Sequence, residues 1–351
     1  MTATIIATFG AWLQRRRLAL GWCRDTAGDA ASYGVRIATA LHDYWYLSDG
    51  SKGWHWTRAL LPYTEQAAPA IGGRLLVRAG HFADRFGEVQ LAQELYAQGA
   101  AIGERIGNHA LLAEAGRNRA VRAEDQTLAR CWAEESLRHA QASEVAREIA
   151  WSMIDLAVLL KNEGDFAAAA SLYEEALQHF RTGGSVYDIA FGSYIVAQFY
   201  DERGDTMRAE ALFASLDNQA LDIAFIVVEV PWRLGCIALA CGDVERAEGL
   251  FHESMRRVQH YDLPYVLRLN LAGLAAVACR NGDYRRAAQL LGADQRHFGD
   301  IHVGHWLGPY WPMYDDALAV CRETLGEEAF AVAWDVGRGM AVEEVLVVWP
   351  T

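Results

Sequence analysis

The sequence predicts an all-α fold, a right-handed superhelical solenoid in which helical hairpins repeat with a period near 40 residues. Three observations predict this fold. Gly-Asp pairs recur along the chain, apolar residues on both sides of each pair follow helical spacing, and good helix formers dominate a sequence with only 7 prolines. The glycines of the pairs are Gly164, Gly204, Gly242 and Gly282, at spacings of 40, 38 and 40 residues.

The hairpin around Gly164 illustrates what each repeat contains. Apolar residues at helical spacing precede and follow the turn, so we expect one helix on each side. Gly164 should end the first helix, because glycine accepts the left-handed conformation of a C-cap. Asp165 should cap the second helix, where its carboxylate accepts backbone N–H groups and faces the positive end of the helix. The apolar positions are Ala150, Met153, Leu156, Ala157 and Leu160, then Ala169, Leu172, Tyr173, Ala176 and Leu177.

Two more positions recur after each Gly-Asp pair. A small residue four positions after the aspartate should let the two helices approach closely, and a larger residue four positions later should fill the groove between them. The small residues are Ala169, Ala209, Ala247 and Ala287, and the larger ones are Tyr173, Phe213, Phe251 and Leu291.

Weaker copies extend the series towards the N-terminus. Gly87 occupies the turn of one copy, Glu124 takes the glycine position of the next, and an opening copy has Gly50 at its turn. We therefore expect about seven hairpins in one continuous domain. Its predicted parts are an N-terminal capping helix (1–35), a TPR-like repeat array of the kind identified below (36–296), and a loop with C-terminal capping helices (297–351).

The recurring residues resemble the tetratricopeptide repeat (TPR) family. Gly164-Asp165-Phe166 with Ala169, Tyr173 and Ala176 matches its motif, as does Gly282-Asp283-Tyr284 with Ala287. The standard motif repeats at about 34 residues, so the helices or linkers here are longer. The stretches ALHDYWYLSDGSKGWHWTRALL and RAAQLLGADQRHFG resemble the entry and the end of the C-terminal sensor region of bacterial LuxR-type and SARP-type regulators. That resemblance implies a bacterial protein of transcription regulation.

The sequence lacks the motifs of the modules that accompany this region in such regulators. It contains no phosphate-binding loop of the form G-x-x-x-x-G-K-[ST] and no basic recognition helix. We therefore expect a sensor region that stands alone.

Composition excludes several partners. The formal net charge of −13 argues against direct binding of nucleic acid, which depends on clustered Lys and Arg. No apolar run approaches the roughly 20 residues that a membrane-spanning helix needs. The six cysteines are scattered without a C-x-x-C pair, which is typical of thiols in a reducing cytoplasm. We predict a cytoplasmic protein, in which the apolar C-terminal stretch MAVEEVLVVWP caps the last hairpin or forms a homodimer contact.

The first helix of each hairpin should line the concave surface, where solenoids commonly bind partners. Positions about 13, 10 and 6 residues before each turn should face inwards, at the helical spacing of three to four. Trp306 should join these positions from a loop that closes one end of the groove. The predicted ligand-binding residues are Arg74, His81, Glu114, Arg117, Trp151, Phe191, Tyr194, Gln198, Glu229, Trp232 and Trp306.

This mixture of residues favours a particular kind of site. Aromatic walls with a few polar groups are typical of a pocket for a mostly apolar small molecule or a short peptide. The repeated Lys, Arg and Asn of a clamp for peptide carboxylates do not appear at these positions. The same rings would otherwise pack between adjacent hairpins, because aromatic residues at helical spacing are core more often than site.

Three functions are therefore open. The first is a regulatory or sequestering module that holds a ligand in the aromatic groove. The second is a protein–protein scaffold, which would depend on charged positions such as Arg74 and Arg117. The third is an enzyme in which Glu114, Glu229 or Asp155 works with His81 as acid and base. His297, His302 and His305 lack the spacing of a metal site, so no metal and no cofactor is expected.

Overall fold

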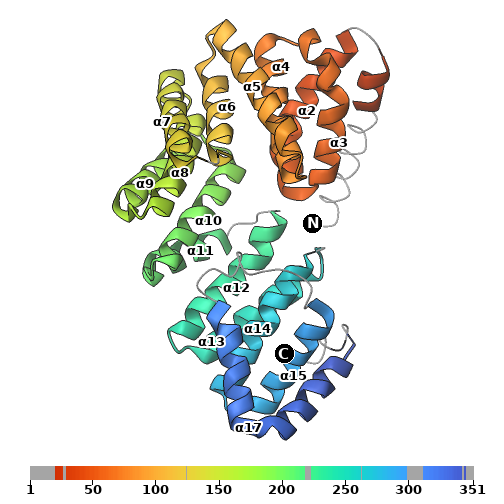
Figure 1. The fold of residues 1–351 in the computed structure, drawn as a ribbon, viewed down its shortest axis with the longest axis vertical. Coiled ribbons are helices and arrows are strands. Elements are labelled where there is room, and N and C mark those ends of the chain that lie inside the picture. Colours follow the sequence, from red (N-terminus) through yellow and green to blue (C-terminus); the bar gives the residue numbers. More distant parts are fainter. Residues whose placement is uncertain are drawn as a thin grey trace. The chain divides into compact units, whose positions relative to one another are not determined.

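The computed structural model describes residues 20–26, 29–123, 125–217, 223–261, 263–298, 311–341 and 344. Throughout these ranges the regular elements are helices, and no strand occurs among them (Figure 1). The predicted all-α fold of stacked helical hairpins is confirmed. None of the helices in the described ranges is both long and apolar enough to cross a bilayer.

The chain divides into two compact units, residues 1–192 and 193–351. The first unit contains α2 (Asp29–Ser48), α3 (Gly50–Leu60), η1 (Leu61–Gln66), α4 (Pro69–Arg85), α5 (Val89–Ile106), α6 (His109–Val121), α7 (Gln126–Ser143), α8 (Ala146–Glu163), α9 (Phe166–Gly183) and the start of α10 (Val186–Glu202). Helices α4 and α5, α6 and α7, and α8 and α9 form hairpins. The first helices of neighbouring hairpins, α4, α6 and α8, also contact one another and form one layer.

The second unit repeats the same plan. It contains the rest of α10, then α11 (Thr206–Asp217), α12 (Ala224–Ala240), α13 (Val244–Val258), α14 (Pro264–Arg280), α15 (Tyr284–Phe298) and α17 (Trp311–Gly339). Helices α12 and α13, and α14 and α15, form hairpins, and α17 packs against α15 and α14.

The turns have the predicted backbone conformation. Gly164, Gly204, Gly242 and Gly282 adopt φ values of 88°, 73°, 84° and 78°, which only glycine adopts without strain. Each following aspartate accepts a backbone N–H at the start of the next helix, as Asp165 does from Ala168 at 3.1 Å. The same cap recurs at Asp205, Asp243 and Asp283. Gly87 also has a positive φ of 79°, in agreement with the weaker copy.

The small and large positions pack as predicted. The four alanines, Ala169, Ala209, Ala247 and Ala287, have no exposed surface, and the larger residues that follow them are buried to the same degree. The structure adds a feature that the motif does not show. A Cβ added at Gly235 on α12 or at Gly273 on α14 would lie 2.8 or 2.6 Å from the ring of Phe251 on α13. The ring therefore occupies space that glycine leaves open in two neighbouring helices.

The opening copy differs from the prediction. Gly50 is the first residue of α3 and has no positive φ, because the turn is made one residue earlier. Asp49 caps α3 and accepts the N–H of Lys52 at 3.0 Å, so an aspartate alone makes this turn. Glu124, most of the predicted N-terminal capping segment and the loop that carries His302, His305 and Trp306 lie outside the described residues. The predicted segment boundaries stay predictions.

Candidate ligand-binding pocket

The first unit contains a cavity of about 260 Å³ on the layer of first helices. Its volume is close to the lower end of small-molecule pockets, about 300 Å³. Side chains of α2, α4, α6, α8 and the start of α10 line it, and Tyr96 of α5 joins them. Four of the predicted residues lie in its lining: His81, Arg117, Trp151 and Phe191.

Trp151 of α8 forms an aromatic wall of this cavity. Its ring centroid lies 5.0 Å from that of Phe180 and 5.7 Å from that of Phe191. Its Nε1 donates a hydrogen bond of 2.8 Å to Asp188 Oδ1. Because one bond anchors the indole and two rings contact it, the wall is held in one orientation. Gly192 makes room for this arrangement, since a Cβ there would lie 2.4 Å from the Phe180 ring.

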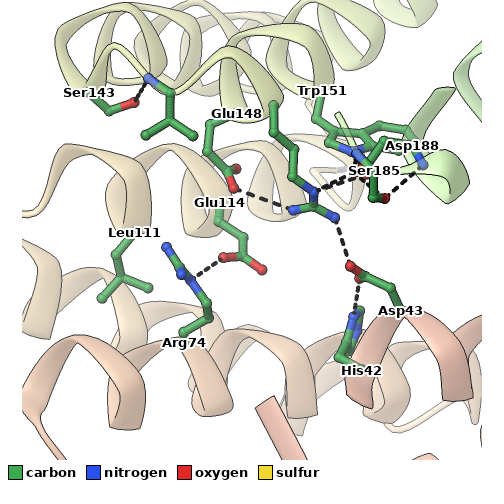
Figure 2. Close-up of polar contacts among 12 residues, drawn as sticks. His42, Asp43, Arg74, Leu111, Glu114, Ser143, Glu148, Trp151, Ser185 and Asp188 are labelled. Atoms are coloured by element: carbon green, nitrogen blue, oxygen red, sulfur yellow. Dashed lines mark hydrogen bonds and ion pairs between the residues drawn. The ribbon is translucent and has the colours of Figure 1, made fainter. Parts of the chain in front are cut away.

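An arginine joins three carboxylates beside this wall (Figure 2). Arg147 Nε donates to both oxygens of Asp188 at 2.9 and 3.0 Å, and its Nη2 donates to Asp43 at 3.1 Å. Nη1 faces Glu148 at 3.4 Å. Burial alone would raise the pKa of Asp188, but Arg147 and the hydrogen bonds from Ser185 and Trp151 outweigh it and lower the pKa. The network fixes the position of helix α10 against α8 and α2 on one side of the cavity.

A second charged cluster, around Glu114, adjoins the cavity through Arg117, and Glu114 is 1% exposed. Its carboxylate lies 3.2 Å from Arg74 Nε and 3.2 Å from Arg78 Nε. Burial would raise the pKa of Glu114, but Arg78, Arg117 and Arg74 together hold it at about 2. Arg117 also lies 4.0 Å from Glu148 and 5.9 Å from the centre of the Trp151 ring. The predicted residues Arg74 and Glu114 thus do not line the cavity but belong to the charged cluster that Arg117 connects to it.

A chain of two histidines and one aspartate reaches the cavity. His81 Nδ1 lies 3.0 Å from His42 Nε2, and His42 Nδ1 lies 2.9 Å from Asp43 Oδ1. Burial lowers the pKa of both histidines, so the neutral forms dominate at neutral pH. The contact with Asp43 assigns the proton of His42 to Nδ1, and the next contact then assigns the proton of His81 to Nδ1. His81 Nε2 is left as an acceptor, buried and without a hydrogen-bond partner among the described residues.

Asp155 of α8 lies one helical turn after Trp151 and also lines the cavity. It forms no hydrogen bond or ion pair with any other residue in the described ranges. Burial raises its pKa to about 6, although the charge of Arg117 partly opposes this shift. A carboxyl group of this kind changes its charge close to physiological pH.

Four predicted residues belong to the second unit. Tyr194 and Tyr265 both donate hydrogen bonds to Glu229, which is 2% exposed, and Gln198 Nε2 donates to the Tyr194 hydroxyl at 3.4 Å. They form a buried polar cluster. Trp232 has no exposed surface and donates from Nε1 to the carbonyl of Leu269 at 3.1 Å. Trp232 therefore packs in the core of this unit. This is the alternative role that the sequence analysis gave for aromatic residues at helical spacing.

Sequence reasoning missed several residues of the cavity. Asn118 could have been predicted, because it lies six residues before Glu124, at a position that the spacing rule expects to face inwards. Arg147 and Asp188 lie four and three residues before the first inward position of their helices, Trp151 and Phe191, and no inward position was assigned in the opening copy, which contains Asp43. Asp155 was considered only as one of several acids for catalysis.

The chain is similar in fold to solved structures of TPR-like proteins. The apo form of the quorum sensor NprR from B. thuringiensis superposes with a TM-score of 0.57 at 12% identity, over 95% of this chain and 96% of that one. A Rap protein complexed with competence and sporulation factor gives a TM-score of 0.52 at 13% identity, over 89% and 95%.

A signal transduction ATPase with numerous domains (STAND) from Pyrococcus horikoshii, which has a tetratricopeptide repeat sensor, gives a TM-score of 0.57 at 15% identity. The match covers 88% of this chain and 46% of that protein, so the chain spans about half its length. No protein-family model matches the chain, and no curated protein matches it. The structural similarities show that the fold is TPR-like, as the repeat motif predicted.

Proposed function

We propose that this chain is a ligand-binding regulatory module and that the cavity of the first unit holds a short peptide or a small molecule. The observation that carries the proposal is the preformed aromatic wall, in which Trp151 is fixed by Asp188 and by the rings of Phe180 and Phe191. A wall that is already ordered loses little side-chain entropy when a ligand binds. Polar groups at its edge, such as Asn118 and Asp155, provide the few directional contacts that a ligand pocket needs.

The similar structures support a regulatory role. One is named as a quorum sensor, one is complexed with competence and sporulation factor, and one carries its repeats as a sensor. A scaffold function is less favoured by the cavity, because Arg74 and Arg117, on which it would depend, already face Glu114 and Glu148.

The proposal is tested by ligand capture. Purified protein is incubated with the low-molecular-mass fraction of a bacterial extract, and native mass spectrometry is used to detect added mass that is lost on denaturation. We expect the wild type to retain a ligand and Trp151→Ala to lose it. Trp132→Ala is a matched control, because Trp132 is half-buried and does not line the cavity. The Cζ atom of Arg119 lies 4.4 Å from the centroid of the Trp132 ring. The proposal would be contradicted if Trp151→Ala retained the same added mass as the wild type. It would also be contradicted if neither the wild type nor any variant retained a ligand.

An enzyme is the second candidate, and one observation favours it. Asp155, with a raised pKa, and His81, with a lowered pKa, line the same cavity, and such pairs of titratable groups are common in acid–base catalysis. A retained compound that returns chemically changed from the wild type, and unchanged from Asp155→Asn, would establish catalysis.

A further inference from the structure

The cavity has an imbalance between its positive and negative groups. Almost every charged side chain in its lining faces a partner of opposite sign. Arg122 Nε donates to Asp84 at 2.8 Å, and Arg147 connects Asp43 with Asp188. The lining and the adjoining cluster around Glu114 hold five arginines, Arg74, Arg78, Arg117, Arg122 and Arg147, against six carboxylates, Asp43, Asp84, Glu114, Glu148, Asp155 and Asp188.

Asp155 is the carboxylate in excess. Among the residues that the structure describes, Arg117 is the cation that attracts it, and the same guanidinium also stabilises Glu114 and faces Glu148. An ionised carboxylate in a partly buried position is unfavourable unless a cation or hydrogen-bond donors compensate it. Within the described part of the chain nothing else does so, and the open side of Asp155 is the cavity.

His81 of α4 offers a second acceptor in the same lining. His81 Nε2 is buried with no hydrogen-bond partner in the described residues, and the contacts of its Nδ1 leave Nε2 without a proton. Asp155, Tyr46 and His81 line the same cavity, and the ring centroids of Tyr46 and His81 lie 6.2 Å apart. The rings of Trp151 and Phe191 line the same cavity. A cationic group with N–H donors suits a carboxylate, a lone pair and aromatic faces together.

We propose that the cavity binds a ligand through a cationic nitrogen, an ammonium or guanidinium group, with Asp155 as its counter-ion and His81 Nε2 as a neutral acceptor. This inference rests on the proposed ligand-binding function and names the chemical class of the ligand. The apolar part of the ligand lies against Trp151 and Phe191, whose rings also favour the positive charge. A free peptide N-terminus, a basic side chain and a simple amine share this chemistry.

The test uses defined probes and native mass spectrometry of the full chain. The probes are four pools of random pentapeptide amides: free N-terminus, N-acetylated with one lysine, N-acetylated without charge, and N-acetylated with one glutamate. A fifth pool contains primary amines without peptide bonds, such as phenethylamine. We expect retention from the cationic pools only. Retention from the fifth pool identifies a small amine as sufficient, whereas retention from the first two alone identifies a peptide.

Two matched variants locate the binding group. Asp155→Asn should weaken binding of the retained probe by about 10- to 100-fold, the loss expected for a charged hydrogen bond. Asp294→Asn makes the same change at another buried acid, in the second unit, whose pKa burial also raises to about 6 in spite of Arg268. It should bind like the wild type. Circular dichroism checks that both variants fold.

The outcomes separate this inference from the proposed function. If uncharged or acidic pools are retained, and Trp151→Ala but not Asp155→Asn abolishes retention, the cavity binds ligands but the cation inference is wrong. If the wild type retains no pool, the result counts against both.

Discussion

The unpaired carboxyl group of Asp155 should cost the protein stability at neutral pH, and Asp155→Asn tests this directly. Burial raises the pKa of Asp155 from 3.8 to about 6 in the folded protein. Folding therefore favours the protonated form. The stability that this preference contributes is fully present below pH 3.8 and is lost as the pH rises through about 6.

The size of the effect follows from the shift in pKa. A difference of about 2 pK units corresponds to about 3 kcal/mol at pH 7.5, since each unit is worth about 1.4 kcal/mol. Asparagine has nearly the same shape as aspartate and cannot ionise. The variant should therefore be more stable than the wild type by about 1 to 3 kcal/mol at pH 7.5, the lower value allowing for residual solvation of the side chain.

Urea unfolding at pH 7.5 and at pH 4 measures the effect. Comparing variant with wild type at each pH cancels the titration of all the other groups. The gain in the free energy of unfolding should be present at pH 7.5 and nearly absent at pH 4. At pH 4 Asp155 is mostly protonated in the folded wild type, so it carries little charge to remove. Glu104→Gln, at an exposed position of α5, should stay within about 0.5 kcal/mol of the wild type at both pH values. A loss of stability at pH 7.5, or an equal gain at both pH values, would refute the reasoning.

Three further predictions test the fold and the charged cluster around Glu114. Tyr173→Ala should reduce the free energy of unfolding by about 3–5 kcal/mol, because Tyr173 is 1% exposed, whereas Met207→Ala, at an 85% exposed side chain, should change it by less than about 0.5 kcal/mol in the same urea titration. Gly164→Ala should reduce the free energy of unfolding by about 1–2 kcal/mol, because φ at this position is 88°. Gly249→Ala on α13, where an added Cβ meets nothing within 4 Å, should instead raise it by about 0.5–1 kcal/mol. Equal effects of the two changes in thermal unfolding would exclude the turn conformation as the cause. Glu114→Gln should cost about 3–5 kcal/mol, because it leaves the charges of Arg74 and Arg78 without their buried partner, and a neutral result in chemical unfolding would mean that water reaches this cluster.

The hairpin repeat could be predicted because its signals are local. A positive φ at Gly164 and an N-cap at Asp165 are properties of a few neighbouring residues, so they leave the same letters in every copy. The prediction was wrong at Gly50, where Asp49 makes the turn alone and no left-handed residue is needed. A glycine near a turn does not by itself show which residue adopts the unusual backbone.

The candidate site could be predicted only in part. Periodicity placed His81, Arg117, Trp151 and Phe191 on the first helices, and these residues do line one cavity. The same rule selected Trp232, which lies in the core of the second unit. Position along a helix indicates a face of that helix, but whether the face meets solvent or another helix depends on how neighbouring hairpins pack.

The sequence by itself determined the class of this protein: an all-α TPR-like chain built from helical hairpins. Only the tertiary structure decided which charges neutralise one another. Arg147 reaches Asp43 across 104 residues of sequence and Asp188 across 41, while Asp155 on the same helix as Arg147 has no such partner among the residues that the structure describes. Such pairing depends on differences of a few ångströms between side chains from separate helices. Coulomb and hydrogen-bond energies change steeply over that range, and helical periodicity does not specify it.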